Sequence, residues 1–212
     1  MHEVLGDFLY IGTGLLVTAQ LVISSILIGL VLGTIIAVLR YNRVLLPVVN
    51  SWVSIIRGTP IVLQLSLVYF SFPQLFNIQL TAISAGILTF SLNSSAYVAE
   101  IFRAGISTIP KGQFEVAKAL EIKPYFMWRD LILPQVFRNT LPSLINEVIA
   151  LLKETAIIGM ISIADISRTA QLLAAERFTY FGPLLIAGAY YYTLVIIIEY
   201  IGRVIEKRIN YA

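Results

Sequence analysis

Apolar stretches long enough to cross a membrane constrain this chain more than any other feature. A spanning helix needs about 20 mostly apolar residues. Five candidates lie within residues 11–39 and 141–163 and at about residues 57–72, 80–104 and 183–201. The second is the weakest, since it is short and Pro60 and Pro73 bound it, and an earlier start near Trp52 is the alternative. The sequence therefore predicts an all-α membrane protein of about five spans, built as a single domain over residues 1–212.

The charge content supports the same class of protein. Only 13% of the residues are charged and 58% are hydrophobic, whereas a soluble domain usually has about 25% charged residues. The chain has no cysteine, which excludes disulfides and thiolate metal sites. Its one histidine is His2, and no serine, histidine and aspartate combine into a nucleophilic site. We expect neither an enzyme nor a metal site.

The distribution of basic residues predicts the orientation. Five spans place the two termini on opposite sides, and Lys and Arg concentrate in cytoplasmic loops. With the N-terminus outside, twelve of the fifteen basic residues fall on the inner side. Arg168 and Arg177 fall outside, and Lys153 falls within a span. We expect an N-out, C-in topology with a large inner loop at about residues 106–140 between the third and fourth spans.

The inner loop has a helical pattern. Phe114, Ala117 and Leu120 recur at three-residue spacing, Pro124 interrupts the pattern, and residues 125–132 can form a second short helix. Such a helix can fit a groove on a soluble partner. It can equally lie on lipid headgroups. The pattern alone does not choose between these two interpretations.

A motif in this loop resembles that of the membrane subunits of bacterial ATP-binding-cassette (ABC) importers. Their loop reads E-A-A, three residues, G, nine residues, I-x-L-P. Here the spacing is kept in full, with Glu115, Ala117, Leu133 and Pro134 matching the motif. Val116 and Leu131 are apolar replacements. Glu121 replaces the glycine, which leaves open how the turn is made, because a left-handed backbone costs a non-glycine residue about 1–2 kcal/mol.

Four further stretches are similar to the polar amino acid permeases of that family. They are residues 57–60 (Arg-Gly-Thr-Pro), 92–106, 109–113 and 151–155. The resemblance implies a multi-pass subunit of the bacterial cytoplasmic membrane that pairs with a second permease subunit, identical or different. It also implies ATPase subunits and an extracytoplasmic amino-acid-binding protein as partners. It assigns ATPase coupling to the inner loop, at Glu115, Ala117, Lys118, Leu120, Glu121, Leu133 and Pro134.

The chain itself lacks the G-x-x-x-x-G-K-[ST] loop that cradles nucleotide phosphates. We therefore expect ATP and Mg²⁺ to bind on a partner subunit, and no cofactor to bind on this chain. No nucleic acid is expected as a partner.

Polar residues within the spans are candidates for a substrate path. Ionisable groups are costly inside a bilayer, and transporters bind substrates near the midplane. A helical rise of 1.5 Å per residue, counted from Leu141, places Lys153 near the middle of the fourth span, level with Gln64 and Asn93. The candidates are Gln64, Asn93, Ser94, Tyr97, Glu147, Lys153, Glu154 and Thr155.

Each candidate also has a purely structural interpretation. Gln64 and Asn93 can join helices, and Lys153 can pair with Glu100 or Glu147. Carboxylates outnumber ammonium groups in these spans, which weakly favours a basic or neutral polar amino acid as substrate. Gly29 and Gly33 form a small-xxx-small pair that allows close helix packing, although glycine is common in membrane helices.

Two other functions compete with an importer subunit. A stand-alone carrier could couple transport to ions through Glu147, Lys153 and Glu154. A membrane scaffold could recruit cytosolic proteins without transport. The motif spacing, kept up to Leu133 and Pro134, favours the importer subunit over the carrier, and the charges inside the spans argue against a scaffold.

Overall fold

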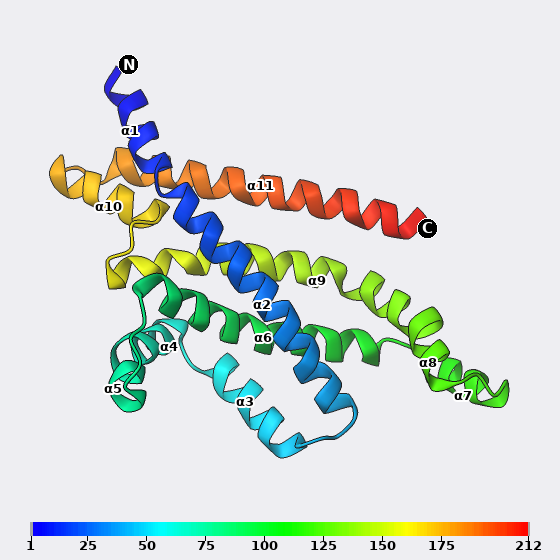
Figure 1. The fold of residues 1–212 in the computed structure, drawn as a ribbon. Helices are drawn as coiled ribbons and strands as arrows, with labels where there is room; N and C mark the ends of the chain where they lie inside the picture. The colour runs from blue at the N-terminus through cyan, green and yellow to red at the C-terminus, as the bar shows by residue number, and fades with distance from the viewer. Residues whose placement is uncertain (1, 212) are drawn as a thin grey trace.

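Long helices run along the molecule (Figure 1). The computed structural model describes residues 2–211, and the side chains of residues 4–209, and this part contains helices and no strand. The long helices are α2 (Leu15–Tyr41), α6 (Ala82–Ser107), α9 (Leu133–Glu154) and α11 (Phe181–Tyr211). The shorter elements are α1 (His2–Gly12), α3 (Leu46–Gly58), α4 (Ile61–Ser66), α5 (Phe72–Phe76), α7 (Lys111–Ala119), α8 (Pro124–Phe126) and α10 (Ile166–Glu176).

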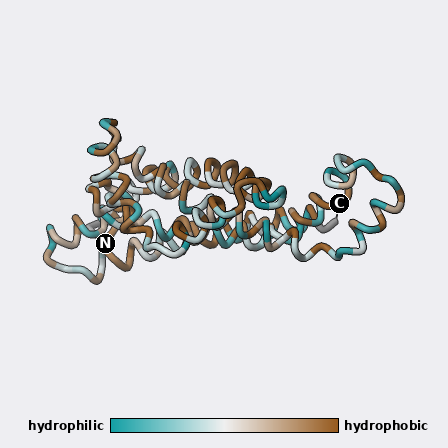
Figure 2. The backbone as a smooth tube through the Cα atoms, turned by 90° about the horizontal axis from the view of Figure 1, so that it is seen from below, coloured by the Kyte–Doolittle hydropathy of each residue, from teal (hydrophilic) through white to brown (hydrophobic). Residues whose placement is uncertain are grey.

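The two chain ends lie at opposite ends of the bundle (Figure 1). The N-terminus, α5 and α10 are at one end, whereas α7, α8 and the C-terminus are at the other. Hydrophobic segments run along the middle of the bundle and hydrophilic segments gather in the loops at its ends (Figure 2). This arrangement agrees with termini on opposite sides of a membrane, and the N-out orientation stays a prediction.

Close packing of α2 on α6 forms the centre of the fold. A Cβ added at Gly29 would lie 2.9 Å from the Cβ of Ser94, and one added at Gly33 would lie 2.6 Å from the Cβ of Val98. Both distances are shorter than real Cβ contacts. The small-xxx-small pair therefore serves specific packing, which settles the question that the sequence left open.

The second predicted span is wrong in its bounds. The structure has two helices there, Leu46–Gly58 and Ile61–Phe76, bent by 104° at a short break. The second of these contains a π-helical turn at Leu67–Ser71. Pro60 explains the break, because proline disfavours helical backbone at the preceding residue, and Thr59 is extended with φ −112° and ψ 143°.

The fourth predicted span, residues 141–163, is also wrong in its bounds. Helix α9 begins at Leu133, with Pro134 in its first turn, and ends at Glu154, where a 3₁₀ segment, Thr155–Ile161, follows. Proline suits the start of a helix, since it needs no N–H partner there. Lys153 therefore lies in the last turn of α9, and its depth in the membrane stays a prediction.

The other spans agree with the sequence in position. The first apolar stretch extends over Val4–Tyr41, the third is Ala82–Ser107 and the fifth is Phe181–Ile209. By length and composition, these are the three spanning candidates in the described residues, or four when the bent pair counts as one. Helix α9 is too polar to be among them, so a total of five stays a prediction. The connection after the 3₁₀ segment contains α10.

Candidate functional site

The middle of the predicted inner loop, residues 111–134, which we call the coupling segment, begins with helix α7 and a defined turn. The Glu121 amide donates to the Lys118 carbonyl at 3.0 Å, and the Ile122 amide donates to the Ala117 carbonyl at 2.9 Å. These two bonds form the Schellman motif that ends many helices. Glu121 occupies its left-handed position, with φ 52°. The turn is therefore made in the way that the family's glycine permits, but with a glutamate.

The buried side of α7 anchors the coupling segment to the bundle. Ala117 is 1% exposed. Phe114 and Trp128 pack against a buried cluster that includes Phe102 of α6 and Val136 of α9. The side-chain amide of Gln113 also exchanges hydrogen bonds of 3.1 and 2.7 Å with that of Gln135. These contacts hold α7 against the end of the bundle, so that the segment is not a free linker.

The opposite side of the coupling segment is exposed and largely apolar. Leu120 is 67% exposed, and Glu115, Lys118 and Glu121 are exposed as well. Further exposed apolar side chains continue along the segment, at Val116, Ile122, Tyr125, Phe126 and Leu131. An apolar patch rimmed by charges is typical of a protein-binding surface.

Short helices complete the coupling segment. Helix α8 and a π-helical turn, Met127–Ile132, occupy the second predicted helix, and Leu133 and Pro134 start α9. Arg129 donates 2.6 and 2.9 Å bonds to Asp130, and these bonds lower the pKa of the Asp130 carboxyl. The Arg129 guanidinium also lies 5.1 Å from the centre of the Phe126 ring. These two exposed charges, Arg129 and Asp130, are therefore held by each other.

Two of the predicted substrate-path residues meet between helices. Gln64 and Asn93 are both buried, and the Asn93 amide donates to Oε1 of Gln64 at 3.4 Å. The Gln64 amide nitrogen donates to the carbonyl of Ile56 at 2.7 Å and to that of Thr59 at 3.1 Å. Gln64 thus satisfies backbone groups at the break between α3 and α4, which is the helix-joining role that its structural interpretation predicted.

The remaining candidates differ in their exposure. Ser94, Glu147 and Thr155 are buried, and the Thr155 hydroxyl donates to the Leu152 carbonyl at 2.7 Å. The Ser94 hydroxyl has no hydrogen-bond partner among residues 4–209. Tyr97 and Glu154 are partly exposed, and Lys153 is exposed. The structure brings Gln64 and Asn93 into contact, and it does not join Lys153 to them.

Glu100 lies in a cluster of arginines that sequence reasoning missed. Its carboxylate is 2.7 Å from Arg40 and 3.9 Å from Arg57, and it also bonds Arg103. The pairing of Lys153 with Glu100 is therefore wrong. The i,i+3 spacing of Glu100 and Arg103 was a visible signal. No sequence signal predicted that Arg40 of α2 would approach Glu100.

Asp165 and Asp7 were also missed. Asp165 caps α10 by accepting from the amides of Ser167 and Arg168, and it accepts from the Tyr191 hydroxyl at 3.0 Å. Asp7 pairs with Arg177. An aspartate directly before a helical pattern is a recognisable N-cap signal, whereas the pair between the two chain regions is not predictable from spacing.

Comparison with known families identifies the class of protein. Residues 29–211 match the family described as "Binding-protein-dependent transport system inner membrane component". The chain belongs to this family. It is a permease subunit of an amino acid ABC transporter, a multi-pass protein of the inner membrane, and not an enzyme.

The relatives found are amino acid permeases that match over nearly their whole length. A Rickettsia typhi protein provisionally named a glutamine transport system permease protein, GlnP, is 46% identical over 94% of this chain and 93% of its own. The Bacillus subtilis arginine transport system permease protein ArtQ is 43% identical over 95% and 93%. The crystal structure of an amino acid ABC transporter with histidines matches with a TM-score of 0.86, at 35% identity and 94% coverage of both chains.

Proposed function

We propose that this permease carries a polar amino acid into the cell, driven by ATP hydrolysis in a partner subunit. The observation that carries this proposal is the coupling segment. Its turn has a left-handed residue at the glycine position of the motif, its inner side is anchored on α6 and α9, and its outer side exposes Leu120 and other apolar residues. An exposed apolar helix on a fixed base suits docking into a groove of a soluble protein.

The coupling role is assigned to seven residues. Glu115, Lys118, Leu120 and Glu121 are exposed and can contact the ATPase directly. Ala117 is buried, so it sets the distance between α7 and the bundle instead. The last two, Leu133 and Pro134, join the coupling segment to α9, which makes them the route by which movement of α7 would reach a long helix.

The substrate is inferred to be a basic or neutral polar amino acid. The relatives named for arginine and glutamine transport support this class. The proposed path is lined by Gln64, Asn93, Ser94, Tyr97, Glu147, Lys153, Glu154 and Thr155. Carboxylates on this path can receive an ammonium group and amides can receive a carboxylate. The buried Ser94 hydroxyl can donate to a substrate.

The partners follow from the same assignment. A second permease subunit, identical or different, completes the pathway, an extracytoplasmic binding protein delivers the amino acid, and ATPase subunits bind ATP and Mg²⁺. The whole chain, residues 1–212, acts as one permease domain in the bacterial cytoplasmic membrane, with its N-terminus outside.

Reconstitution in lipid vesicles tests the proposal. Vesicles with the permease and its ATPase in the membrane are loaded with ATP, and the binding protein is added outside. Uptake of labelled arginine and glutamine is then measured. Uptake that requires ATP and both partners supports the proposal. Uptake by the permease alone under a sodium or proton gradient would instead support the competing ion-coupled carrier.

A further inference from the structure

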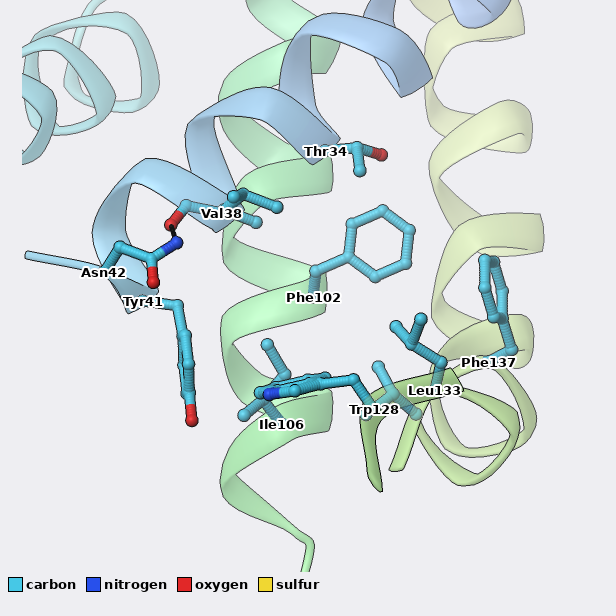
Figure 3. A pocket seen from close by; sticks show the side chains of 11 residues that line it. Thr34, Val38, Tyr41, Asn42, Phe102, Ile106, Trp128, Leu133 and Phe137 are labelled. Carbon is cyan, nitrogen blue, oxygen red and sulfur yellow. Dashed lines mark hydrogen bonds between the residues drawn. The ribbon is translucent and has the colours of Figure 1, made fainter. Parts of the chain in front are cut away.

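An apolar groove opens at the end of the bundle that carries the coupling segment. It has a volume of about 370 Å³ and lies between α2, α6 and the start of α9 (Figure 3). Figure 3 shows the aromatic rings of Tyr41, Phe102 and Trp128 around this space. The apolar groove is lined mainly by Val38, Tyr41, Phe102, Ile106, Trp128 and Phe137.

Two polar side chains in the wall of the apolar groove, Thr34 and Asn42, donate hydrogen bonds to carbonyls of α2. The Thr34 hydroxyl donates to the Leu30 carbonyl at 2.7 Å, and the Asn42 amide donates to the Val38 carbonyl at 3.0 Å. Their donors are therefore directed to their own helix. A polar occupant would lose hydrogen bonds with water and find few in return. The chemistry of the apolar groove selects a hydrocarbon.

The apolar groove is continuous with a face of α2 that turns away from the bundle. Val31, Ile35 and Val38 occur along α2 at spacings of four and three residues and are 61, 51 and 52% exposed. Val38 belongs both to this stripe and to the wall of the groove. Since exposed apolar residues of a membrane helix face lipid, the bilayer itself can supply the occupant.

A basic pocket adjoins the apolar groove. It has a volume of about 230 Å³ and shares Ala37, Tyr41 and Ile106 with the groove, and Arg40 and Arg103 also line it. Basic pockets between spanning helices are known to bind anionic lipid headgroups. The two cavities therefore place an apolar compartment and a basic one side by side.

The arginine cluster gives the basic pocket an excess of positive charge. Arg40 and Arg103, which line the pocket, share the single carboxylate of Glu100, which leaves one positive charge in excess there, and Arg57 lies 3.9 Å from the same carboxylate outside the lining. Arg40 uses its Nε and Nη1 for bonds to Asn50 and Glu100, and Arg103 uses its Nε and Nη2 for Glu100. Because each guanidinium has five N–H donors, both can still donate to a phosphate.

We propose that the apolar groove and the basic pocket together bind an anionic phospholipid from the leaflet next to the coupling segment. An acyl chain lies in the groove, and the phosphate lies against Arg40 and Arg103. Tyr41 of α2 contacts Trp128 of the coupling segment, with ring centres 4.7 Å apart. A bound lipid would thus fill the space between a spanning helix and the segment proposed to contact the ATPase.

Photolabelling in vesicles tests this proposal. The full-length permease, purified with the subunits that accompany it, is placed in vesicles of phosphatidylglycerol and phosphatidylcholine. Each lipid is supplied in turn with a diazirine on its acyl chain, and labelled peptides are identified by mass spectrometry. We expect the phosphatidylglycerol probe to label residues 34–42 and 128–137 at least roughly five times more than the phosphatidylcholine probe, as expected for one cation or more at the headgroup.

Matched variants separate the two compartments. Val38→Trp fills the apolar groove from its exposed wall and should reduce labelling of residues 128–137 several-fold, whereas Val31→Trp, on the same stripe but outside the groove, should not. Arg103→Gln should remove most of the preference for phosphatidylglycerol, whereas Arg203→Gln, an exposed arginine of α11, should retain it.

Two results would overturn the proposal. Equal labelling by the two probes would mean ordinary contact with surrounding lipid, without a headgroup site. If these peptides carry no label, and a photo-crosslinking amino acid placed at position 38 captures an accompanying subunit instead, the groove accommodates protein. Neither result bears on ATP-driven uptake, so failure here is distinct from failure of the proposed function.

Discussion

The amide of Ile122 donates a 2.9 Å hydrogen bond to the carbonyl of Ala117, and this bond closes α7 around a left-handed residue. That residue is Glu121, at φ 52°. The family motif has glycine at this position, and glycine reaches the same backbone without steric cost. The coupling segment therefore keeps its geometry at some cost in free energy.

Replacing Glu121 with glycine should stabilise the protein. Relief of the left-handed strain, about 1–2 kcal/mol, exceeds the entropy that glycine loses on folding, about 0.5–1 kcal/mol. We expect the thermal unfolding midpoint in detergent to rise modestly. Glu115→Gly, inside α7, is the control and should lower the midpoint, because glycine is unfavourable within a helix. A fall in the midpoint for Glu121→Gly would show that contacts of the glutamate stabilise the protein by more than its left-handed backbone costs.

Replacing Gln64 with leucine should destabilise the break between α3 and α4. The variant removes the bonds of 2.7 and 3.1 Å to the carbonyls of Ile56 and Thr59. Buried acceptors left without a donor cost about 1–3 kcal/mol. Ser66→Ala is the matched control, since its hydroxyl bonds only to its own helix, at the Val62 carbonyl. Equal unfolding midpoints for the two variants would contradict the joining role of Gln64.

Replacing Gly33 with alanine should separate α2 from α6. The new methyl group would lie 2.6 Å from the Cβ of Val98 and 2.8 Å from the carbonyl of Ser95, so the helices must move apart. Overpacking of this kind costs about 1–3 kcal/mol. Gly188→Ala in α11 meets no atom within 4 Å and should be neutral or stabilising. Unfolding in detergent compares the two, and an unchanged Gly33→Ala variant would refute specific packing at this site.

Replacing Glu154 with glutamine tests charge selection on the proposed substrate path. If this carboxylate receives the ammonium of a basic side chain, uptake of arginine should fall about ten-fold more than uptake of glutamine, since hydrogen bonds to charged groups contribute about 1.5–3 kcal/mol. Glu176→Gln, at the end of α10 and exposed, serves as control and should affect neither. Equal losses for the two amino acids would remove Glu154 from any role in selecting charge.

The sequence predicted the positions of most helices better than their bounds. Apolar runs located α2, α6 and α11, because burial in lipid demands them over a whole span. Pro60 and Pro134 were visible as punctuation, yet their effects differed: one bends a hydrophobic pair by 104° and the other begins α9 eight residues before the predicted start. Local preference marks such positions, whereas tertiary packing decides whether the chain bends or continues as a helix after them.

In the candidate site, too, local features were predictable from the sequence and contacts between helices were not. Spacing of the motif marked Glu121 as the glycine position but left open how the turn is made, and the structure places the left-handed residue there. The contact between Gln64 and Asn93 was predictable only roughly, from their levels on two helices. The partners of Glu100 on α2 and α3 depend on how three helices pack, and no periodicity within one segment predicts that.

Docking of the coupling segment on an ATPase is the central claim, and a photo-crosslinking amino acid at position 120 tests it most directly. Position 120 suits the probe because Leu120 is 67% exposed, whereas Ala117 beside it is buried. In membranes that take up the amino acid, we predict a cross-link to an ATPase subunit that changes in yield when ATP is added. Sustained uptake without any cross-linked ATPase would contradict the account.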